Sequence, residues 1–489
     1  MNYSEYFEKF NKNDNEEVVQ FISNQNAERF LTENAPRLYC PDEVVEETFA
    51  FRTWTMRKHI MDTEDGFLLS EFLTKTHLSW AGKHNTINAA LTHHLNEFRW
   101  LKNSDAFLDY ISFFLTGEGS AYAYHTPALT AMYNFCILTA NEGFLIDNAS
   151  AFEKYFSEWE KKHLTDNGLY WSIDDREGTE FTISGTMPDM SRPKGFRLLL
   201  NSCMYADALS LSKIFALIED KEKEKLYSKK ASYIKSQVDE KMWDGEFYKA
   251  IHPYNQDLDR QIDFTHIPEE CNVRELMGYI PWAFNLPSDG KSDCFSLLKD
   301  PTVFNATTGF TTADTSHPRF LFYQEKACTW NGNVWPYATS YAINAVIELL
   351  NNYVQDTITE KDLYAFIKKY AEMHYSIEDG EKINFIDEVM RPFEYIWNVR
   401  EAVKNGYNLT GGPNRGRDYN HSTFIDLVLR GLCGIDVNNT ELTVNPKIQG
   451  IWKWFKIENL TFRKSSYNVY YDEDGTAFNK GKGVIIEKI

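Results

Sequence analysis

Apolar residues recur at helical spacing along much of this chain and predict a mainly α-helical body. Between Pro336 and Val354 they stand at positions 337, 341, 342, 345, 346, 349, 350 and 353, a spacing that places them on one side of a helix. Pro336 suits the first turn of that helix, where its missing N–H costs nothing. Segments 206–218, 363–373 and 424–432 show the same pattern. Long loops rich in Gly, Asn, Asp and aromatic residues separate these helices, and loops of that length in a compact chain are usually functional.

After about Gly434 the pattern changes to the short alternation that is typical of β-strands. Leu442 and Val444 alternate with polar residues, and segments 455–457 and 469–471 predict short strands. The Asp-Glu-Asp-Gly segment 472–475 predicts a turn that ends the second strand. We therefore expect a short β-rich appendage over 435–489, a helical body over 76–434, and an N-terminal segment over 1–75 that forms part of the body.

Composition narrows the class of protein. The 489 residues are 43% hydrophobic and include 12 Trp, 28 Tyr and 34 Phe, enough for a large core and an aromatic-lined cleft. The chain has no apolar run of the length that a membrane span needs. The net charge of -20 disfavours nucleic acids and anionic membranes as partners.

Cysteine usage and the first residues bear on the compartment. The seven cysteines, at 40, 136, 203, 271, 294, 328 and 433, are odd in number and form no Cys-x-x-Cys pair, which argues against a disulfide framework and a zinc cluster. We expect reduced, buried thiols. Residues 1–9 contain neither the basic region nor the apolar region of a secretory signal, so the expected location is the cytoplasm.

Two acidic motifs, 177–182 (EGTEFT) and 388–392 (EVMRP), stand far apart in the chain, and a tryptophan-rich segment, 329–336 (TWNGNVWP), lies between them. Cleavage of a glycosidic bond needs such a pair of carboxyl groups. One acid protonates the leaving oxygen, and one carboxylate activates water or attacks the sugar. Aromatic rings supply the flat apolar faces on which sugars stack. The motifs therefore favour a carbohydrate as substrate.

The order of these blocks resembles that of the glycoside hydrolases with an (α/α)6 toroid, the six-hairpin glycosidases, which include trehalases, family 63 α-glucosidases and mannosylglycerate hydrolases. The bacterial mannosylglycerate-hydrolase-like subgroup is the most similar. The resemblance runs from about Trp80 to the C-terminus and rests on blocks 80–85, 177–182, 197–207, 329–335, 388–392 and 417–422. It implies a mainly α fold, an (α/α)6 toroid with a small C-terminal β appendage. It also implies an intracellular hydrolase of a small glycoside or oligosaccharide that inverts the anomeric centre and uses no cofactor.

The resemblance implies that Glu180 is the general acid. In the family a Gly-x-Asp-x-Ser-like block carries the acid, and 178–182 matches it with Glu in place of Asp and Thr in place of Ser. The additional methylene moves the carboxyl by about 1.5 Å, so Asp175 and Glu177 remain alternatives. A solvated acidic loop is the structural explanation that competes with all three.

The resemblance likewise implies that Glu388 is the general base, because the family's base opens a Glu-x-x-x-Pro-x-Thr-Gly block. The Glu and the Pro are present, but Glu394 and a tyrosine replace Thr-Gly. Glu394 and Asp418 are therefore alternatives, and Arg417 beside Asp418 favours its ionised form. Arg391 is the candidate cation near Glu388. Inversion requires the two carboxyl groups to stand roughly 6.5–9.5 Å apart.

Further polar and aromatic residues are candidates for binding the substrate. Arg197, Asn201 and Tyr205 are four residues apart and therefore share one helical face. Trp330 and Trp335 flank an Asn-Gly-Asn turn, and a core tryptophan pair is the alternative. Asp418 is expected at a helix start, where capping the helix is the alternative role. The candidate substrate-binding residues are Trp80, Lys83, His84, Asn85, Arg197, Asn201, Tyr205, Trp330, Asn331, Trp335, Asp418, Tyr419 and His421.

Other classes of function share some of these features. A sugar epimerase on the same toroid would use His84 or His421, a phosphorylase would need a basic pocket such as 415–417, and a glycan-binding protein would not need both acids. The histidines lack a metal-ligand spacing, so no metal is expected. The paired carboxylates favour hydrolysis, with a small carbohydrate as the partner. The sequence carries no pattern that fixes the oligomeric state, the sugar or the linkage.

Overall fold

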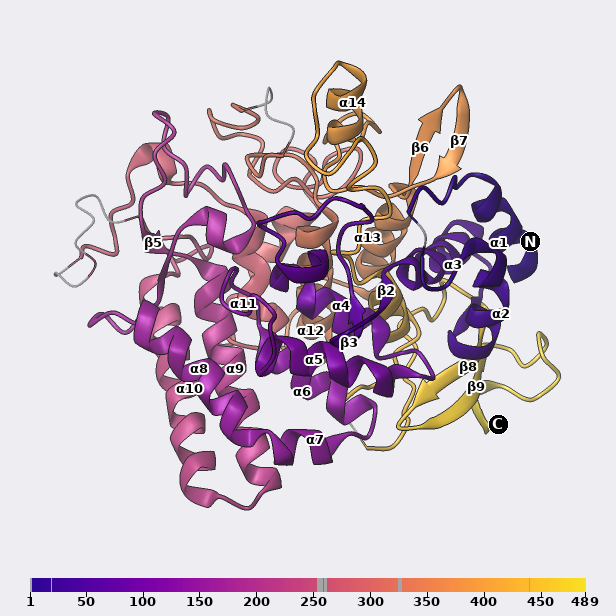
Figure 1. Ribbon diagram of the computed structural model, residues 1–489. Helices are drawn as coiled ribbons and strands as arrows, with labels where there is room; N and C mark the ends of the chain where they lie inside the picture. Colours follow the sequence, from indigo (N-terminus) through magenta and orange to yellow (C-terminus); the bar gives the residue numbers. More distant parts are fainter. Residues whose placement is uncertain (1, 19, 253–257, 259–261, 324–327, 439) are drawn as a thin grey trace.

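A computed structural model describes residues 2–489 except 19, 253–257, 259–261, 324–327 and 439, and it is mainly helical (Figure 1). The helices are α1 Tyr3–Lys12, α2 Asn24–Asn34, α3 Glu43–Lys58, α4 Leu91–Phe98, α5 Leu108–Leu115, α6 Ala128–Leu138, α7 Glu142–Asp147, α8 Ala149–His163, α9 Leu198–Leu217, α10 Lys221–Lys241, α11 Ile280–Ala283, α12 Pro336–Asn352, α13 Glu360–Glu372, α14 Asn398–Lys404 and α15 Phe424–Leu427. The strands are β1 Arg37–Tyr39, β2 Ile60–Thr63, β3 Gly66–Leu69, β4 Trp171–Ser172, β5 Gly195–Phe196, β6 Tyr375–Glu378, β7 Glu381–Asn384, β8 Trp454–Phe462, β9 Ser465–Asp472 and β10 Gly483–Lys488.

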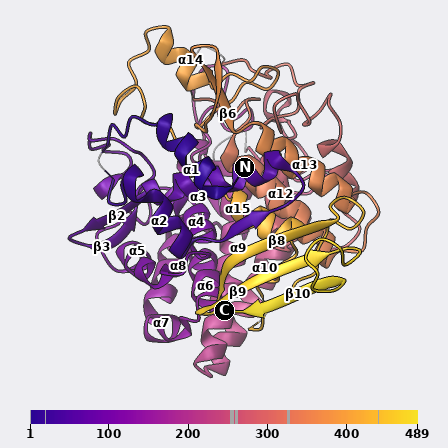
Figure 2. The ribbon, with the colours of Figure 1, turned by 90° about the vertical axis from the view of Figure 1, so that its right-hand side faces the viewer.

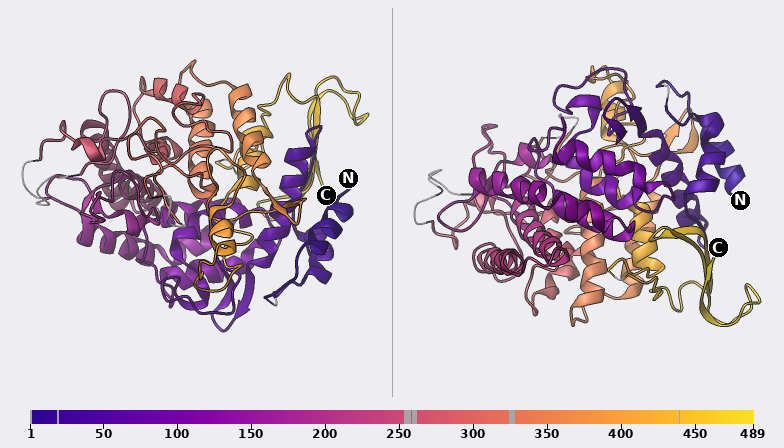
Figure 3. Two further views of the ribbon diagram at one scale, coloured as in Figure 1. Left: turned by 90° about the horizontal axis from the view of Figure 1, so that it is seen from above. Right: turned by 60° about the horizontal axis from the view of Figure 1, so that its bottom comes forward.

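Helix packing closes into a ring. Helix α4 packs on α6, α6 on α9, α9 on α11, α11 on α12, α12 on α15, and α15 on α4. Helices α3, α8, α10 and α13 pack against members of this ring, and two further views show them around the body (Figure 3). The result is a helical toroid of the glycosidase type, with its apolar core between the helices.

The four helices that the apolar spacing predicts are confirmed. Helix α12 begins at Pro336 and ends at Asn352, and α13 begins with a capping box in which Thr359 and Asp362 satisfy each other's backbone N–H groups. Segment 424–432 is α15 followed by one π-helical turn. Helix α9 begins at Leu198 rather than near Ala206. Its first turns are buried on every side, so no polar face exists there to mark the helical period.

The C-terminal appendage is an antiparallel sheet in the order β1-β8-β9-β10. The predicted strands lie within β8 and β9, and the predicted turn is confirmed, because the Asp472 carboxylate accepts from the backbone N–H of Gly475. Val444 forms only an isolated bridge with Ile435 rather than a strand. Strand β1 lies more than 400 residues before its partner β8, yet Leu38 pairs with Ile457. The two termini consequently lie on one side of the molecule (Figure 2).

The N-terminal segment packs into the body as expected, since α3 contacts both α13 and α15. The division into 1–75, 76–434 and 435–489 stays a prediction, and the sheet crosses it because β1 belongs to the first part. Within the described residues, no helix combines the length and the apolar character needed to cross a membrane.

Candidate active site

A cavity of about 290 Å³ brings the two acidic motifs together. Its lining comes from loops that precede ring helices rather than from the helices' buried flanks. The aromatic lining residues are Phe72, Trp80, Tyr124, Phe181, Trp335, Tyr337 and Tyr419, and the charged or polar ones are Glu177, Glu180, Cys328, Glu388, Arg415 and His421. Aromatic walls around a few convergent carboxyl groups are typical of a carbohydrate site.

Glu180 follows a short helical turn, 174–177, that Gly178 ends in the left-handed conformation. Burial raises the pKa of Glu180 to about 7, and the nearby carboxylates of Asp175, Asp174 and Glu388 act in the same direction. A carboxyl group with this pKa is half protonated near neutral pH and can donate a proton. Within the described residues, no cation forms an ion pair with it.

The two neighbours of Glu180 are engaged elsewhere. Asp175 forms an ion pair with Arg192, remains 39% exposed and does not line the cavity. Glu177 reaches the cavity wall, but its carboxylate lies 2.8 Å from the guanidinium of Arg197 and accepts from the backbone N–H of Leu200. Burial still raises the pKa of Glu177, against the effect of Arg197.

Glu388 lies across the cavity from the acidic turn and is 6% exposed. Its loop is anchored to the start of α12, because Met390 and Val334 exchange backbone hydrogen bonds of 2.9 Å. Burial raises the pKa of Glu388, Arg415 opposes this rise, and Asp387 adds to it. The Arg415 guanidinium lies 3.3 Å from the Glu388 carboxylate.

The competitors of Glu388 face other partners. Glu394 is exposed and lies 3.2 Å from Arg391, so Arg391 serves Glu394 and not Glu388. Asp418 is buried, forms an ion pair with Lys58, and does not line the cavity. Burial would raise the pKa of Asp418, but Lys58 and Arg417 together hold it below its usual value.

Asp418 also does not begin a helix, contrary to expectation. Its backbone has a φ of 61°, and α15 begins six residues later, at Phe424. The left-handed residue turns the chain so that Tyr419 and His421 enter the cavity wall with stacked rings whose centroids are 4.9 Å apart. Burial lowers the pKa of His421 to about 3, which keeps its imidazole neutral.

The tryptophans divide into lining and core residues. Trp80 is 38% exposed and lines the cavity, and so does Trp335. Trp330 stacks behind Trp335 at 4.3 Å and is only 1% exposed. Asn331 is fully buried, and its side-chain oxygen, once the amide is oriented correctly, accepts from the backbone N–H groups of Phe322 and Tyr323. Trp330 and Asn331 therefore support the wall from behind.

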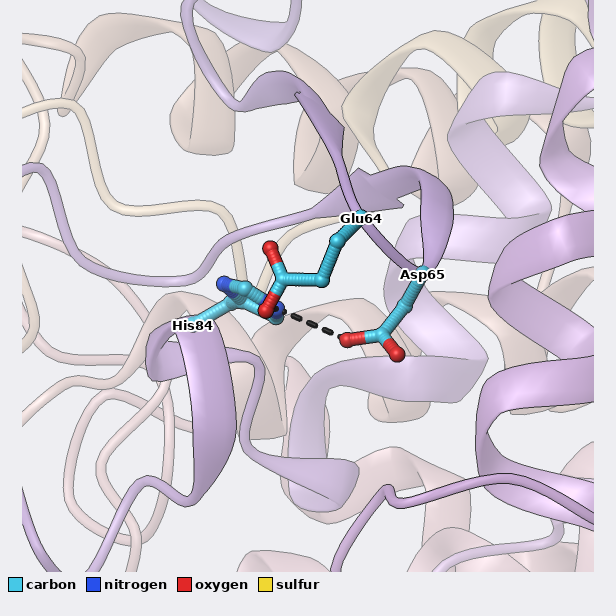
Figure 4. A group of neighbouring side chains, drawn as sticks. All are labelled: Glu64, Asp65 and His84. Atoms are coloured by element: carbon cyan, nitrogen blue, oxygen red, sulfur yellow. Dashed lines mark hydrogen bonds and ion pairs between the residues drawn. The ribbon is translucent and has the colours of Figure 1, made fainter.

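Lys83 and His84 lie outside the cavity, in the cluster shown in Figure 4. His84 Nε2 lies 2.9 Å from Asp65 and 3.6 Å from Glu64. Although this trio has the donor types of a metal site, the Lys83 ammonium lies 2.6 Å from Asp65 and 3.3 Å from Glu64 and already neutralises them. Its neighbour Asn85 is buried and bonds to the backbone of Leu78 and Thr76.

The face formed by Arg197, Asn201 and Tyr205 points into protein rather than into the cavity. Asn201 bonds twice to the backbone of Tyr170, through its side-chain oxygen and its amide nitrogen, at 2.9 Å each. The Tyr205 hydroxyl donates to the backbone oxygen of Asn285. Arg197 reaches the site only through Glu177. Polar residues at helical spacing here reflect a buried hydrogen-bond network.

Three site residues escaped sequence reasoning in this role: Phe72, Tyr124 and Arg415. Phe72 and Tyr124 follow no periodic pattern, because they stand in irregular loops. Arg415 had a visible signal, the Gly-rich segment 410–417 shortly before the Arg-Asp-Tyr block. Tight turns and close backbone approaches require glycine, and such a segment near a predicted site is a reason to examine its charged residue.

Structural comparison places this chain among carbohydrate-active enzymes. A structure named "Sialidase" shares 29% sequence identity and superposes with a TM-score of 0.86 over 100% of this chain and 43% of that one. A family 63 mannosylglycerate hydrolase from Thermus thermophilus, solved in complex with glucose, shares 10% identity with a TM-score of 0.52 over 78% of this chain and 99% of that one. At that identity the likeness concerns the fold alone.

Sequence comparison finds a longer relative as well. An uncharacterized protein of Borreliella burgdorferi is 26% identical over 220 residues, which is 44% of this chain and 41% of that protein. The chain thus spans less than half the length of this relative and of the sialidase. Residues 83–422 match the family described as the mannosylglycerate hydrolase MGH1-like glycoside hydrolase domain. Because this match covers most of the chain and includes both acidic motifs, the chain belongs to the MGH1-like glycoside hydrolase family.

Proposed function

We propose that this chain hydrolyses a small glycoside or oligosaccharide, with Glu180 as general acid and Glu388 as general base. The observation that carries the proposal is the contrast between two carboxyl groups in one cavity. Glu180 has a pKa of about 7 and no cation beside it, whereas Glu388 has the Arg415 guanidinium at 3.3 Å. Environments that separate two carboxyl groups in this way assign the acid and the base.

The chemistry follows from these two states. Protonated Glu180 donates its proton to the glycosidic oxygen as the bond to the anomeric carbon breaks. Ionised Glu388 takes a proton from a water molecule, whose oxygen bonds to the anomeric carbon from the opposite face. The product then has the inverted configuration. Aromatic rings such as Trp80, Trp335 and Tyr419 hold the sugar by stacking.

The cavity supports a small substrate. Its volume of about 290 Å³ is at the lower end of the range for small-molecule sites, and loops close it on several sides. We also infer that the ring of α4, α6, α9, α11, α12 and α15 is the inner layer of an (α/α)6 toroid over 76–434, with 435–489 as its β appendage. The ring contacts support this architecture.

The test is a hydrolysis screen against aryl α- and β-glycosides, small disaccharides and glycosyl glycerates. Glu180→Gln and Glu388→Gln are each expected to reduce kcat by at least 10²-fold, the usual scale for acid–base catalysis. Glu394→Gln is the matched control, because Glu394 is exposed and outside the cavity. Proton NMR of the first-formed anomer distinguishes inversion from retention. Full activity in either cavity variant would remove that residue from its role, and epimerisation without hydrolysis would replace the proposal.

A further inference from the structure

The glycine-rich loop 410–417 passes unusually close to the loop that carries Glu388. A Cβ atom built on Gly416 would lie 2.3 Å from Asp387 Oδ1 and 3.5 Å from Glu388 Cγ. Gly411 has a φ of +93°, and a Cβ there would lie 3.0 Å from Leu78 and 3.1 Å from the Arg415 side chain. Glycine at both positions therefore allows the loop to bring Arg415 against the Glu388 loop.

Arg415 is held from several directions and is only 11% exposed. Its Nη2 lies 3.3 Å from Glu388 Oε2, and its Nη1 donates to the backbone oxygen of Thr410. The guanidinium carbon lies 5.3 Å from the ring centres of both Phe72 and Trp80. These contacts fix the cation in place. Its Nε is buried and has no hydrogen-bond partner among the described residues, so the pairing with Glu388 is the ionic contact that the side chain makes.

Charges around Glu388 are otherwise unfavourable to an anion. Asp387 and Glu71 are the negative groups that act on it, and Arg400 and Arg415 are the positive ones. Arg400 forms its ion pair with Asp387 instead. The remaining titratable neighbours are Cys328, whose sulfur lies 3.9 Å from the Glu388 carboxylate, together with Tyr419 and Glu180 across the cavity.

We propose that Arg415 is a positioning residue that holds the Glu388 carboxylate ionised and correctly oriented, and that the glycines of loop 410–417 serve to deliver it. The proposal rests on the proposed function, since it concerns the base of that reaction. Arg415 acts through Glu388 and not on the substrate. A cation at this distance lowers a carboxyl pKa by about 1–3 units, enough to decide whether a buried glutamate is ionised near neutral pH.

The experiment measures kcat/KM against pH for the whole chain and for Arg415→Gln, using a substrate that the wild type hydrolyses. The acidic limb reports protonation of the base. We expect Arg415→Gln to move this limb upward by about 1–3 pH units and to lower kcat, with KM little changed. Arg415→Lys retains the charge and should restore part of the shift. Arg391→Gln is the matched control: Arg391 pairs with exposed Glu394, and its profile should equal that of the wild type.

The outcomes separate the two proposals. Hydrolysis that survives in Glu388→Gln contradicts the proposed function, whatever Arg415 does. An inactive Glu388→Gln combined with an unmoved acidic limb in Arg415→Gln overturns only the present inference. A pure rise in KM would also overturn it, because that result identifies a substrate contact. If Arg415→Gln does not fold, Arg415→Met removes the same charge while its apolar stem still packs on Phe72 and Trp80, and the same limb is measured.

Discussion

Replacing Gly416 with alanine adds one methyl group at the closest approach of two loops in the site. The new Cβ would lie 2.3 Å from Asp387 Oδ1, whereas real Cβ atoms keep at least 3.0 Å from their neighbours. One of the two loops must therefore retreat by about 0.7 Å. The backbone of Gly416 does not have the positive φ that favours glycine, so the steric contact alone is responsible for the effect.

Asp387 cannot move aside easily. It is fully buried, its Oδ1 accepts from the backbone N–H of Glu388 at 2.7 Å, and its other oxygen pairs with Arg400. Overpacking of this kind costs about 1–3 kcal/mol of folding free energy. The displacement is passed directly to Glu388 and Arg415, and a misplacement near 1 Å reduces a catalysed rate by up to about 10²-fold.

Urea unfolding and kcat with a substrate found in the screen measure both effects in Gly416→Ala. Gly143→Ala is the control, because its Cβ would meet nothing within 4 Å, and helix α7 should tolerate or favour alanine there. We expect the control to match the wild type in kcat. Wild-type stability and wild-type kcat in Gly416→Ala would refute the reasoning that the close approach at this residue positions the base.

Further expectations concern the acid, the aromatic wall and the buried network. Because burial raises the pKa of Glu180 from an ordinary 4.5 to about 7, its ionisation disfavours the folded state as pH rises through this window; Glu180→Gln should have a higher Tm than the wild type at pH 8 and a similar one near pH 4, in thermal scans. Trp80→Ala should raise KM with little change in Tm, since Trp80 is 38% exposed, whereas Trp330→Ala should lose about 3–5 kcal/mol of stability by urea titration. Asn201→Ala should lose about 1–3 kcal/mol, because it leaves the Tyr170 backbone unpaired, and should keep the wild-type KM.

Sequence patterns predicted the elements that have one apolar face and one polar face. Helices α12 and α13 follow the 3.6-residue period, and their observed bounds agree with it closely. The first turns of α9 carry no such period because protein surrounds them, and β1 is only three residues long. Short or fully buried elements depend on contacts from distant parts of the chain, which no local pattern contains.

Prediction of the site succeeded where chemistry and spacing coincide, and stopped where loops decide. Glu180 and Glu388 stand more than 200 residues apart, yet the structure places both in one cavity. Their roles stay predictions. The cation beside Glu388 is Arg415, 27 residues away, and not the near neighbour Arg391. Sequence proximity is a poor guide to charge pairing, because a loop brings its side chains to whatever the fold places beside it.

The pairing of β1 with β8 has a consequence for the synthesis of this protein on the ribosome. Residues 37–39 are made early, but their hydrogen-bond partners 456–458 emerge only near the end of translation. Until then Leu38, which is fully buried in the finished sheet, has no strand to cover it. Contacts of such large sequence separation form slowly and leave apolar surface and strand edges open in the meantime. Early release of a chain shortened before β8 should therefore give a species that aggregates through its N-terminal segment rather than a smaller folded enzyme.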